Sequence, residues 1–417
     1  MPSPARLMVS VALACSIQAT VAEAASPVPE GSQFVVVNLD YNSGGGVEMD
    51  EDGNMIVSWN LFFGGPGARG YGYDGTPAAF FTIEPHGGLM SGEPMDSAAL
   101  GSNDFAFVWE GSFEGLQARR YDIDGTPLDT AIQVTAAGGA FQDIEPAIAR
   151  WSPGTEMIVV WGTNNPATGD TDSFGIDARG FDASGTPLGP AFRVNGHIAS
   201  HQQKPDIGVA PGNGFLIVWE SDGSDGTDSD GFSIQAHRFS AAGVGGTLFQ
   251  VNSFTTGGQR RPAVALAADG TALVVWEGTS EGTDPDGSIQ GRIVDSTGEP
   301  LGSDFQINTT TAGEQTHPQV APLGDCFQVV WRSTDGVFTQ AVSAAGALLG
   351  SEMPVSSPSK TFYKRPTVTA NASSSVVSWA EGDELGLDDV FGQRYTLALF
   401  ADGFESGDTA AWSTTVP

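Results

Sequence analysis

The sequence predicts an all-β protein: a seven-bladed β-propeller of four-stranded antiparallel blades, closed by an N-terminal strand that completes the last blade. Three observations predict this fold. A short apolar run ending in Trp recurs seven times, each run lies in the same frame of strand-like segments, and the last repeat lacks one strand that the start of the chain can supply. Repeated units of four short strands are typical of propeller blades.

The Trp-ended runs define the repeat. Successive Trp residues lie 48 to 58 residues apart, and runs such as FLIVW and ALVVW precede them. A unit of this size cannot bury both of its own faces, so we expect each Trp to lie between adjacent blades. The structural Trp residues are Trp59, Trp109, Trp161, Trp219, Trp276, Trp331 and Trp379.

Each repeat contains four strand-like segments. A Pro-led segment such as PAVALA from Pro262 comes first, and the Trp-ended run follows it. An alternating stretch such as IQGRIVD, a turn such as TGEPLG and a short FQVN-like segment complete the unit. Gly, Pro and Asp bound these segments, and no helical period occurs within them, which indicates strands. Asp74-Gly75 and Asp124-Gly125 supply the positive φ of tight hairpin turns.

The two ends of the chain favour a closed ring. The seventh repeat contains PTVTA, SVVSW and FGQRYTLALF, which provide three strands. Residues 33–38 (QFVVVN) resemble the missing FQVN segment. A closed ring removes the unpaired edges that an open solenoid would have to cap. We therefore expect a propeller over residues 33–400 and a separate tail over residues 401–417.

The first 25 residues predict a secretory signal peptide. One basic residue, Arg6, precedes an apolar run that ends at small residues near Ala24, which is the order of a cleavable export signal. The run is too short to span a bilayer. Residues before Cys15 fit a lipidation box poorly. We expect a secreted, extracellular or periplasmic monomer without a lipid anchor or a transmembrane segment.

The charge balance limits the partners. The formal charge is −33, from 50 acidic and 17 basic residues. This balance disfavours nucleic acid and anionic membranes, whereas an extracellular glycan, a protein or a cation remains compatible. The content of hydrophobic residues, 40%, is too high for a disordered chain.

Two resemblances accompany these patterns. The unit P-x-V-A…VVWEG…IQGR…G-x-PLG…FQVN, from about Gln33 to Phe400, resembles a repeat of large exported proteobacterial proteins. The tail LFADGFESGDTAAWS is similar to a C-terminal motif of secreted proteobacterial proteins. The first resemblance implies an exported, propeller-like protein, often near calcium-binding modules. Neither resemblance implies a catalytic residue.

The longer loops are expected on one face. In a four-stranded blade, the loop between the second and third strands lies on the same side as the link to the next blade, and binding residues concentrate on such loops. Here these loops are acidic. The predicted ligand-binding face comprises Glu220, Asp222, Glu277, Glu281, Asp383 and Glu384.

Calcium is one interpretation of the acidic loops. Calcium takes oxygen ligands from alternate Asp residues on Gly-containing loops. The loops D-S-D-G and D-P-D-G resemble those of integrin-type propellers, although both lack the closing Asp of that pattern. The alternative is that they are simply solvated acidic segments. The candidate calcium ligands are Asp225, Asp228, Asp230, Asp284 and Asp286.

A basic residue recurs in the third segment. It could form a ring that grips an anion or a sugar, or each cation could pair with a nearby acid such as the Glu after Trp. The position holds His237 and Gln340 in two repeats. The predicted basic ring consists of Arg69, Arg119, Arg179, Arg292 and Arg394.

These patterns favour a secreted, non-catalytic binding propeller, with calcium as its one candidate cofactor. The sequence contains no HExxH, no C-x-x-C and no G-x-S-x-G, so no catalytic residue is predicted. The alternative is a carbohydrate-active hydrolase or lyase that uses carboxylates of the loop face, because glycoside hydrolysis needs little more than a suitably spaced pair. A purely structural envelope protein is the third interpretation.

Overall fold

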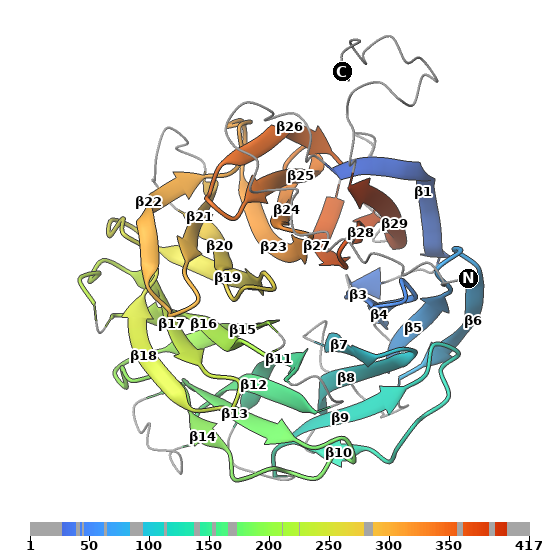
Figure 1. Cartoon of the computed structure of the whole chain (residues 1–417), viewed down its shortest axis with the longest axis horizontal. Helices are drawn as coiled ribbons and strands as arrows, with labels where there is room; N and C mark the ends of the chain where they lie inside the picture. The colour runs from blue at the N-terminus through green and yellow to red at the C-terminus, as the bar shows by residue number, and fades with distance from the viewer. Residues whose placement is uncertain are drawn as a thin grey trace, which may run out of the picture.

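The computed structural model describes residues 27–38, 42–43, 46–61, 65–83, 95–111, 115–136, 142–151, 156–165, 173–210, 212–224, 226–278, 287–356, 362–382 and 388–397. Their strands form seven antiparallel sheets around a common centre (Figure 1). The all-β fold and the seven-bladed propeller are therefore confirmed. Within these residues, no helix has the length and apolar character needed to cross a membrane.

The strands occupy equivalent positions in each blade, and we number the blades 1 to 7 from β4 to β28. The innermost strands are β3 (Val47–Met49), β7 (Asp96–Gly101), β11 (Asp143–Arg150), β15 (Gln202–Ala210), β19 (Gln259–Leu266), β23 (Gln315–Leu323) and β27 (Phe362–Ala370). The second strands, which carry the repeat Trp, are β4 (Met55–Leu61), β8 (Asp104–Gly111), β12 (Met157–Thr163), β16 (Gly214–Asp222), β20 (Ala272–Gly278), β24 (Cys326–Ser333) and β28 (Ser374–Gly382).

The third and fourth strands form the outer half of each blade. The third strands are β5 (Gly65–Tyr71), β9 (Gly115–Tyr121), β13 (Gly175–Phe181), β17 (Phe232–Phe239), β21 (Ser288–Val294), β25 (Gly336–Ser343) and β29 (Asp388–Leu397). The outermost strands are β6 (Pro77–Thr82), β10 (Ile132–Gln133), β14 (Phe192–Arg193), β18 (Gly245–Gln250), β22 (Pro300–Gln306), β26 (Leu348–Pro354) and β1 (Pro27–Asn38). Blade 1 has an additional strand, β2 (Asn42–Ser43), which pairs with β4.

The hydrophobic core lies between the blades. The described residues form seven buried clusters, and each contains one repeat Trp. Trp276 of blade 5, for example, packs with Leu216 and Val218 of blade 4. All seven Trp side chains are buried. The Trp is therefore the residue through which each blade packs on the blade before it.

Strand β1 belongs to blade 7 rather than to blade 1. It pairs antiparallel with β29, so this sheet has the order β1-β29-β28-β27. The pairing brings the two ends of the described chain to one blade (Figure 1). Phe34 and Val36 of β1 join the cluster of Trp59, which spans blades 7 and 1.

The basic ring contacts backbone carbonyls. Arg69 Nη1 donates to Val36 O at 3.0 Å, and Arg292 Nη1 donates to Val251 O at 2.6 Å. Each acceptor lies at the end of the outermost strand of the preceding blade, and the equivalent His237 contacts Val194 O in the same way. These side chains therefore tie neighbouring blades together at the outer part of the ring.

The remaining three ring residues differ from one another. Arg179 donates to Val134 O, and Arg119 donates to Asp129 O within its own blade. In blade 7 the strand register places Gln393, not Arg394, opposite Val377. The prediction for Arg394 was wrong by one position because the apolar pattern of that third strand does not reveal its register.

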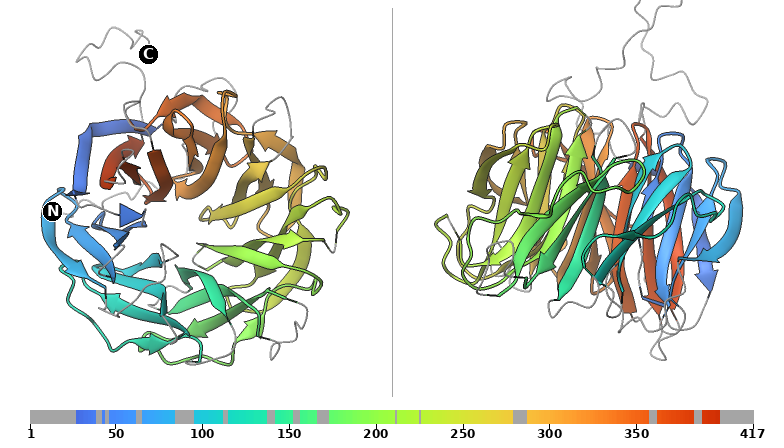
Figure 2. Two further views of the ribbon diagram at one scale, coloured as in Figure 1. Left: turned by 180° about the vertical axis from the view of Figure 1, so that it is seen from behind. Right: turned by 90° about the horizontal axis from the view of Figure 1, so that it is seen from below.

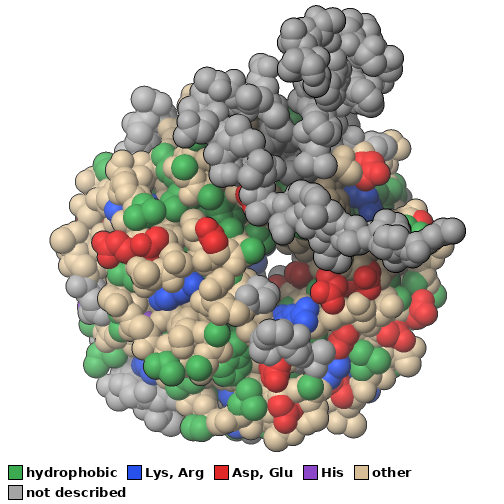
Figure 3. Space-filling model, in the orientation of Figure 1, with side chains coloured by type: hydrophobic (Ala, Val, Ile, Leu, Met, Phe, Trp, Pro, Cys, Tyr) green, Lys and Arg blue, Asp and Glu red, His purple; other side chains and the backbone are tan. Residues whose placement is uncertain are grey.

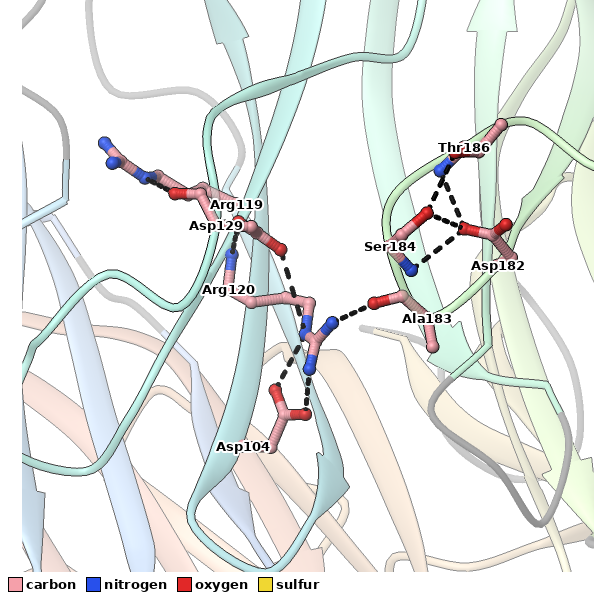
Figure 4. Close-up of polar contacts among 8 residues, drawn as sticks. All are labelled: Asp104, Arg119, Arg120, Asp129, Asp182, Ala183, Ser184 and Thr186. Atoms are coloured by element: carbon pink, nitrogen blue, oxygen red, sulfur yellow. Dashed lines mark hydrogen bonds and ion pairs between the residues drawn. The ribbon is translucent and has the colours of Figure 1, made fainter.

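Arg394 instead occupies the position of Arg120 in blade 2. Figure 4 shows Arg120 between two blades, where it forms an ion pair with Asp104 and donates to the carbonyl of Ala183 in the next blade. Asp182 holds the same turn by accepting hydrogen bonds from Ser184 and Thr186. Arg394 likewise donates to Tyr73 O of blade 1. At these two junctions, an arginine side chain therefore joins its blade to a tight turn of the next blade.

Candidate binding site at the channel mouth

The strands run through the thickness of the disc (Figure 2), so one face carries the starts of the first and third strands and the ends of the second strands. This is the face on which the sequence placed the longer loops. The ring is open at its centre (Figure 3). We call the end of this opening on the loop face the channel mouth.

A β-bulge recurs where the innermost strands reach the mouth. The residue before the strand Pro adopts a positive φ in four consecutive blades: 51° at Glu145, 51° at Lys204, 49° at Arg261 and 56° at His317. Each lies at a register shift of its strand. A positive φ is unfavourable for residues with a Cβ, and a bulge reorients the side chain of the residue that carries it.

Carboxylates of the preceding blade hold three of these bulges. Lys204 N donates to Glu145 Oε2 at 3.0 Å, and Arg261 N donates to Glu220 Oε2 at 2.8 Å. His317 N donates to Glu277 Oε1 at 2.6 Å. Because a charged acceptor strengthens a hydrogen bond, these contacts offset part of the backbone strain and hold each bulge in place.

Two of the same carboxylates also form ion pairs. Glu220 accepts Lys204 Nζ at 3.3 Å, and Glu277 accepts Arg261 Nη1 at 2.7 Å. Both acids follow the repeat Trp and are buried. In blade 6 the residue after Trp331 is Arg332, and in blade 7 the residue before Pro366 is Arg365. The residue before the Pro is therefore cationic on blades 4, 5 and 7 and is His317 on blade 6, where Arg332 occupies the position that Glu220 and Glu277 have on blades 4 and 5.

These residues form one electrostatic unit, which we call the mouth cluster: Lys204, Arg261, His317, Arg332 and Arg365. Burial lowers the pKa of the His317 imidazole to about 3, and the charges that add to this effect are those of Arg261, Arg365, Arg332 and Lys204. The imidazole is therefore neutral at neutral pH. The exposed fractions of the Lys204, Arg261 and His317 side chains are 25%, 36% and 18%. These three side chains therefore remain partly accessible.

A second set of titratable groups, three carboxyls, lies on the innermost strands. Asp96 Oδ2 accepts Ile148 N at 2.8 Å, and Asp206 Oδ2 accepts Val264 N at 2.7 Å. Burial raises the pKa of Asp96 to about 7 and that of Asp206 to about 6. Burial and the charge of Asp96 raise the pKa of Glu48 well above its usual range. These acids each bind the innermost strand of the next blade.

The predicted ligand-binding face is only partly described. Glu220 and Glu277 support the bulges beneath the mouth cluster, and Asp222 accepts a hydrogen bond from Ser200. Glu281, Asp383 and Glu384 lie outside the described residues. The mouth cluster itself was not predicted. Its signal was a charged residue or His directly before the Pro of five innermost segments, from Glu145 to Arg365.

The two described calcium candidates bind protein groups. Asp228 is buried and accepts Asn252 Nδ2 at 2.7 Å, while Asp230 Oδ2 accepts Gly257 N at 3.1 Å. They fasten the loop after β16 to the link between blades 4 and 5. Asp225, Asp284 and Asp286 lie outside the described residues. Across the described part of the chain, no group of three or more His, Cys, Asp or Glu side chains is arranged to hold a metal ion.

Comparisons with known proteins show the fold. No family model and no curated protein matches the chain. Among solved structures, the polysaccharide lyase Uly1 is similar with 9% identity and a TM-score of 0.56, over 89% of this chain and 100% of that one. The Dos1 propeller is similar with 14% identity and a TM-score of 0.50, over 89% and 95%. A Dyadobacter fermentans protein of unknown function has 11% identity and a TM-score of 0.51, over 90% and 99%.

Proposed function

We propose that this protein is a secreted, non-catalytic propeller that binds an acidic extracellular glycan through the carboxylates of its sugars. The observation that carries the proposal is the mouth cluster, in which four cationic side chains and a neutral imidazole gather at one end of the channel. In a chain with 17 basic and 50 acidic residues, this concentration is far above the average composition.

The chemistry of the cluster favours carboxylates. Arginine guanidinium groups bind carboxylates with two parallel hydrogen bonds and are more weakly hydrated than ammonium groups. Arg261, Arg332 and Arg365 belong to three successive blades, and the charges of all three act on the His317 imidazole, so a carboxylate bound beside that imidazole would be attracted by all three. Uly1, whose structure is similar over 89% of this chain, is named a polysaccharide lyase, which is in keeping with a glycan as the ligand.

Polygalacturonate provides the first test. We expect the mature chain to bind this acidic polymer, measured by isothermal titration calorimetry, and to ignore neutral galactan. Arg365→Gln should weaken binding about tenfold, because a hydrogen bond to a charged group contributes about 1.5–3 kcal/mol. Arg150→Gln is the matched control, since Arg150 ends β11 at the other end of the same innermost layer. Equal binding by galactan, or unchanged binding by Arg365→Gln, would overturn the proposal.

The alternative is a hydrolase or a lyase acting at the same face. One observation bears on it: His317 is a neutral imidazole among cations that could neutralise a substrate carboxylate. A general base works best with a pKa near the working pH, however, and a pKa of about 3 makes His317 a weak base. Polygalacturonate incubated with the protein should therefore gain neither reducing ends nor the ultraviolet absorbance of unsaturated uronates. Either product would establish an enzyme.

A further inference from the structure

Two aromatic side chains lie at neighbouring blade junctions on the loop face. Phe174 lies directly before β13, and its ring stacks on His201 of blade 4 with centroids 6.2 Å apart and planes 24° apart. Phe232 begins β17, and the guanidinium of Arg260 from blade 5 lies 4.2 Å from the centre of its ring. Each ring thus covers the junction to the next blade on the loop face.

The aromatic pairs are close to the cationic residues along the chain. His201 precedes Lys204 by three residues, and Arg260 is adjacent to Arg261. At a rise of about 3.3 Å per residue, His201 and Lys204 are separated by about 10 Å. His201 is exposed, while Phe174, Phe232 and Arg260 are half-buried. The pairs therefore retain surface that a ligand can reach beside the mouth.

The aromatic residues are not a requirement of the blade. The strand registers place Gly287 of blade 5 and Asp335 of blade 6 at the position of Phe232. A ring thus occurs in blades 3 and 4, directly before the blades that carry Lys204 and Arg261. The His201 imidazole also has a polar neighbour, since Ser173 Oγ lies 2.9 Å from its Nδ1. This combination of a flat apolar surface and a few polar groups is typical of ligand sites.

We propose that Phe174, His201, Phe232 and Arg260 form a second subsite, the aromatic shelf, on which further sugar rings of the acidic glycan stack. This inference rests on the proposed function, because the carboxylate of one sugar must first be held at the mouth cluster. The carbon-bound hydrogens on one face of a pyranose pack well on a flat ring. The shelf therefore selects a chain of several sugars over a single uronate.

The test compares ligands of different length on the mature chain. Galacturonic acid and its hexamer are titrated calorimetrically into the wild type, Phe174→Ala and Phe80→Ala. The matched control, Phe80, is half-exposed on the outermost strand β6, far from the mouth in the blade. We expect the wild type to bind the hexamer more tightly than the monomer. Phe174→Ala should lose about threefold to tenfold of hexamer affinity and keep the affinity for the monomer.

The outcomes separate this inference from the proposed function. Binding of the monomer without a gain for the hexamer, or an unchanged hexamer affinity in Phe174→Ala, would refute the shelf and keep the mouth cluster. Absence of binding by both ligands would refute both. Should Phe174→Ala fail to fold, as judged by its thermal melting, the exposed His201→Ala takes its place with the same expectation.

Discussion

Asn252 shows how single side chains join the blades. It ends the FQVN segment of blade 4, and its Oδ1 accepts Ile234 N at 2.8 Å. Its Nδ2 donates to Asp228 and to Gln259, the first residue of β19 in blade 5. Asn195 and Asn308 make the equivalent contacts in blades 3 and 5. The Asn therefore connects the end of one blade to the start of the next.

We expect Asn252→Ala to lower the free energy of unfolding by about 1–3 kcal/mol, since it leaves the buried Ile234 N–H and the Asp228 and Gln259 side chains without this partner. Urea unfolding followed by tryptophan fluorescence measures the change. Asn213→Ala is the control, because its side chain donates one exposed hydrogen bond to Ala268 O. Equal losses in the two variants would show that the network contributes nothing of its own.

Some of these residue roles could be predicted from the sequence, and others could not. The repeat Trp was recognisable because an aromatic residue at one position of every apolar run indicates packing. The partners of the basic ring were not recognisable, since Arg69 and Arg292 bind backbone carbonyls and a carbonyl has no signature in the sequence. The strand-ending Asn was noticed only as the end of a strand.

At the scale of elements, the pairing of β1 was predicted from the repeat pattern of the sequence. The QFVVVN segment was recognised as a fourth strand, and the structure pairs it with β29. The two strands pack closely here, because a Cβ at Gly392 would lie 2.4 Å from the Phe34 ring. Gly392 is thus required by close approach, which is one of the reasons for a glycine within a strand.

We expect Gly392→Ala to cost about 1–3 kcal/mol of unfolding free energy, since the new methyl group overlaps the Phe34 ring. Phe34→Ala removes the obstacle, so the double variant should lose less than the sum of the single variants, by about 0.5–3 kcal/mol. Gly189→Ala is the control, because nothing lies within 4 Å of a Cβ there. Additive losses in chemical denaturation would mean that β1 does not pack on β29.

The bulges illustrate what a strand pattern cannot reveal. The Pro-led segments predicted five innermost strands, but a left-handed conformation one residue before the Pro is not expected for Lys204 or Arg261. That conformation exists because Glu145 and Glu220 bind the two backbone N–H groups from the preceding blade. The site therefore depends on contacts between repeats, whereas the sequence pattern describes each repeat separately.

At the scale of the whole molecule, the ring brings acids from distant blades into one channel. Glu48, Asp96 and Asp206 belong to blades 1, 2 and 4; the charges of Asp96 and Asp206 add to the raised pKa of Glu48, and the charge of Asp206 adds to that of Asp96. The sequence predicted the ring and the loop face. It did not predict this interior, because groups that face one another across a channel are separated by whole repeats.

We expect these acids to make stability fall with rising pH. The unfolded carboxyls titrate near pH ~4, whereas the folded pKa of Asp96 is about 7 and that of Asp206 about 6. Between these pKa values the folded state binds more protons than the unfolded state. The free energy of unfolding therefore decreases as the pH rises from about 4 toward 7. Asp96→Asn resembles the protonated acid and should therefore gain stability relative to the wild type from pH 5 to pH 8.

Thermal melting of both proteins across that pH range measures the difference. Asp74→Asn provides a control of opposite sign, because hydrogen bonds from Thr76 lower the pKa of Asp74. Its charged form stabilises the fold fully above the unfolded pKa of about 4, so this variant should be less stable than the wild type by a constant amount from pH 5 to pH 8. Parallel pH profiles for the wild type and Asp96→Asn would show that Asp96 is not protonated in the fold.

The carboxylate-held bulges have a consequence for how such a site can arise. The acceptor lies on one repeat and the bulge on the next, as with Glu220 and Arg261. A tandem duplication therefore copies both halves of the device but joins them only where the copies meet. The inherited unit of this candidate site is the junction. A ring that gains or loses one repeat therefore changes the surface around its channel without any substitution in the repeats that remain.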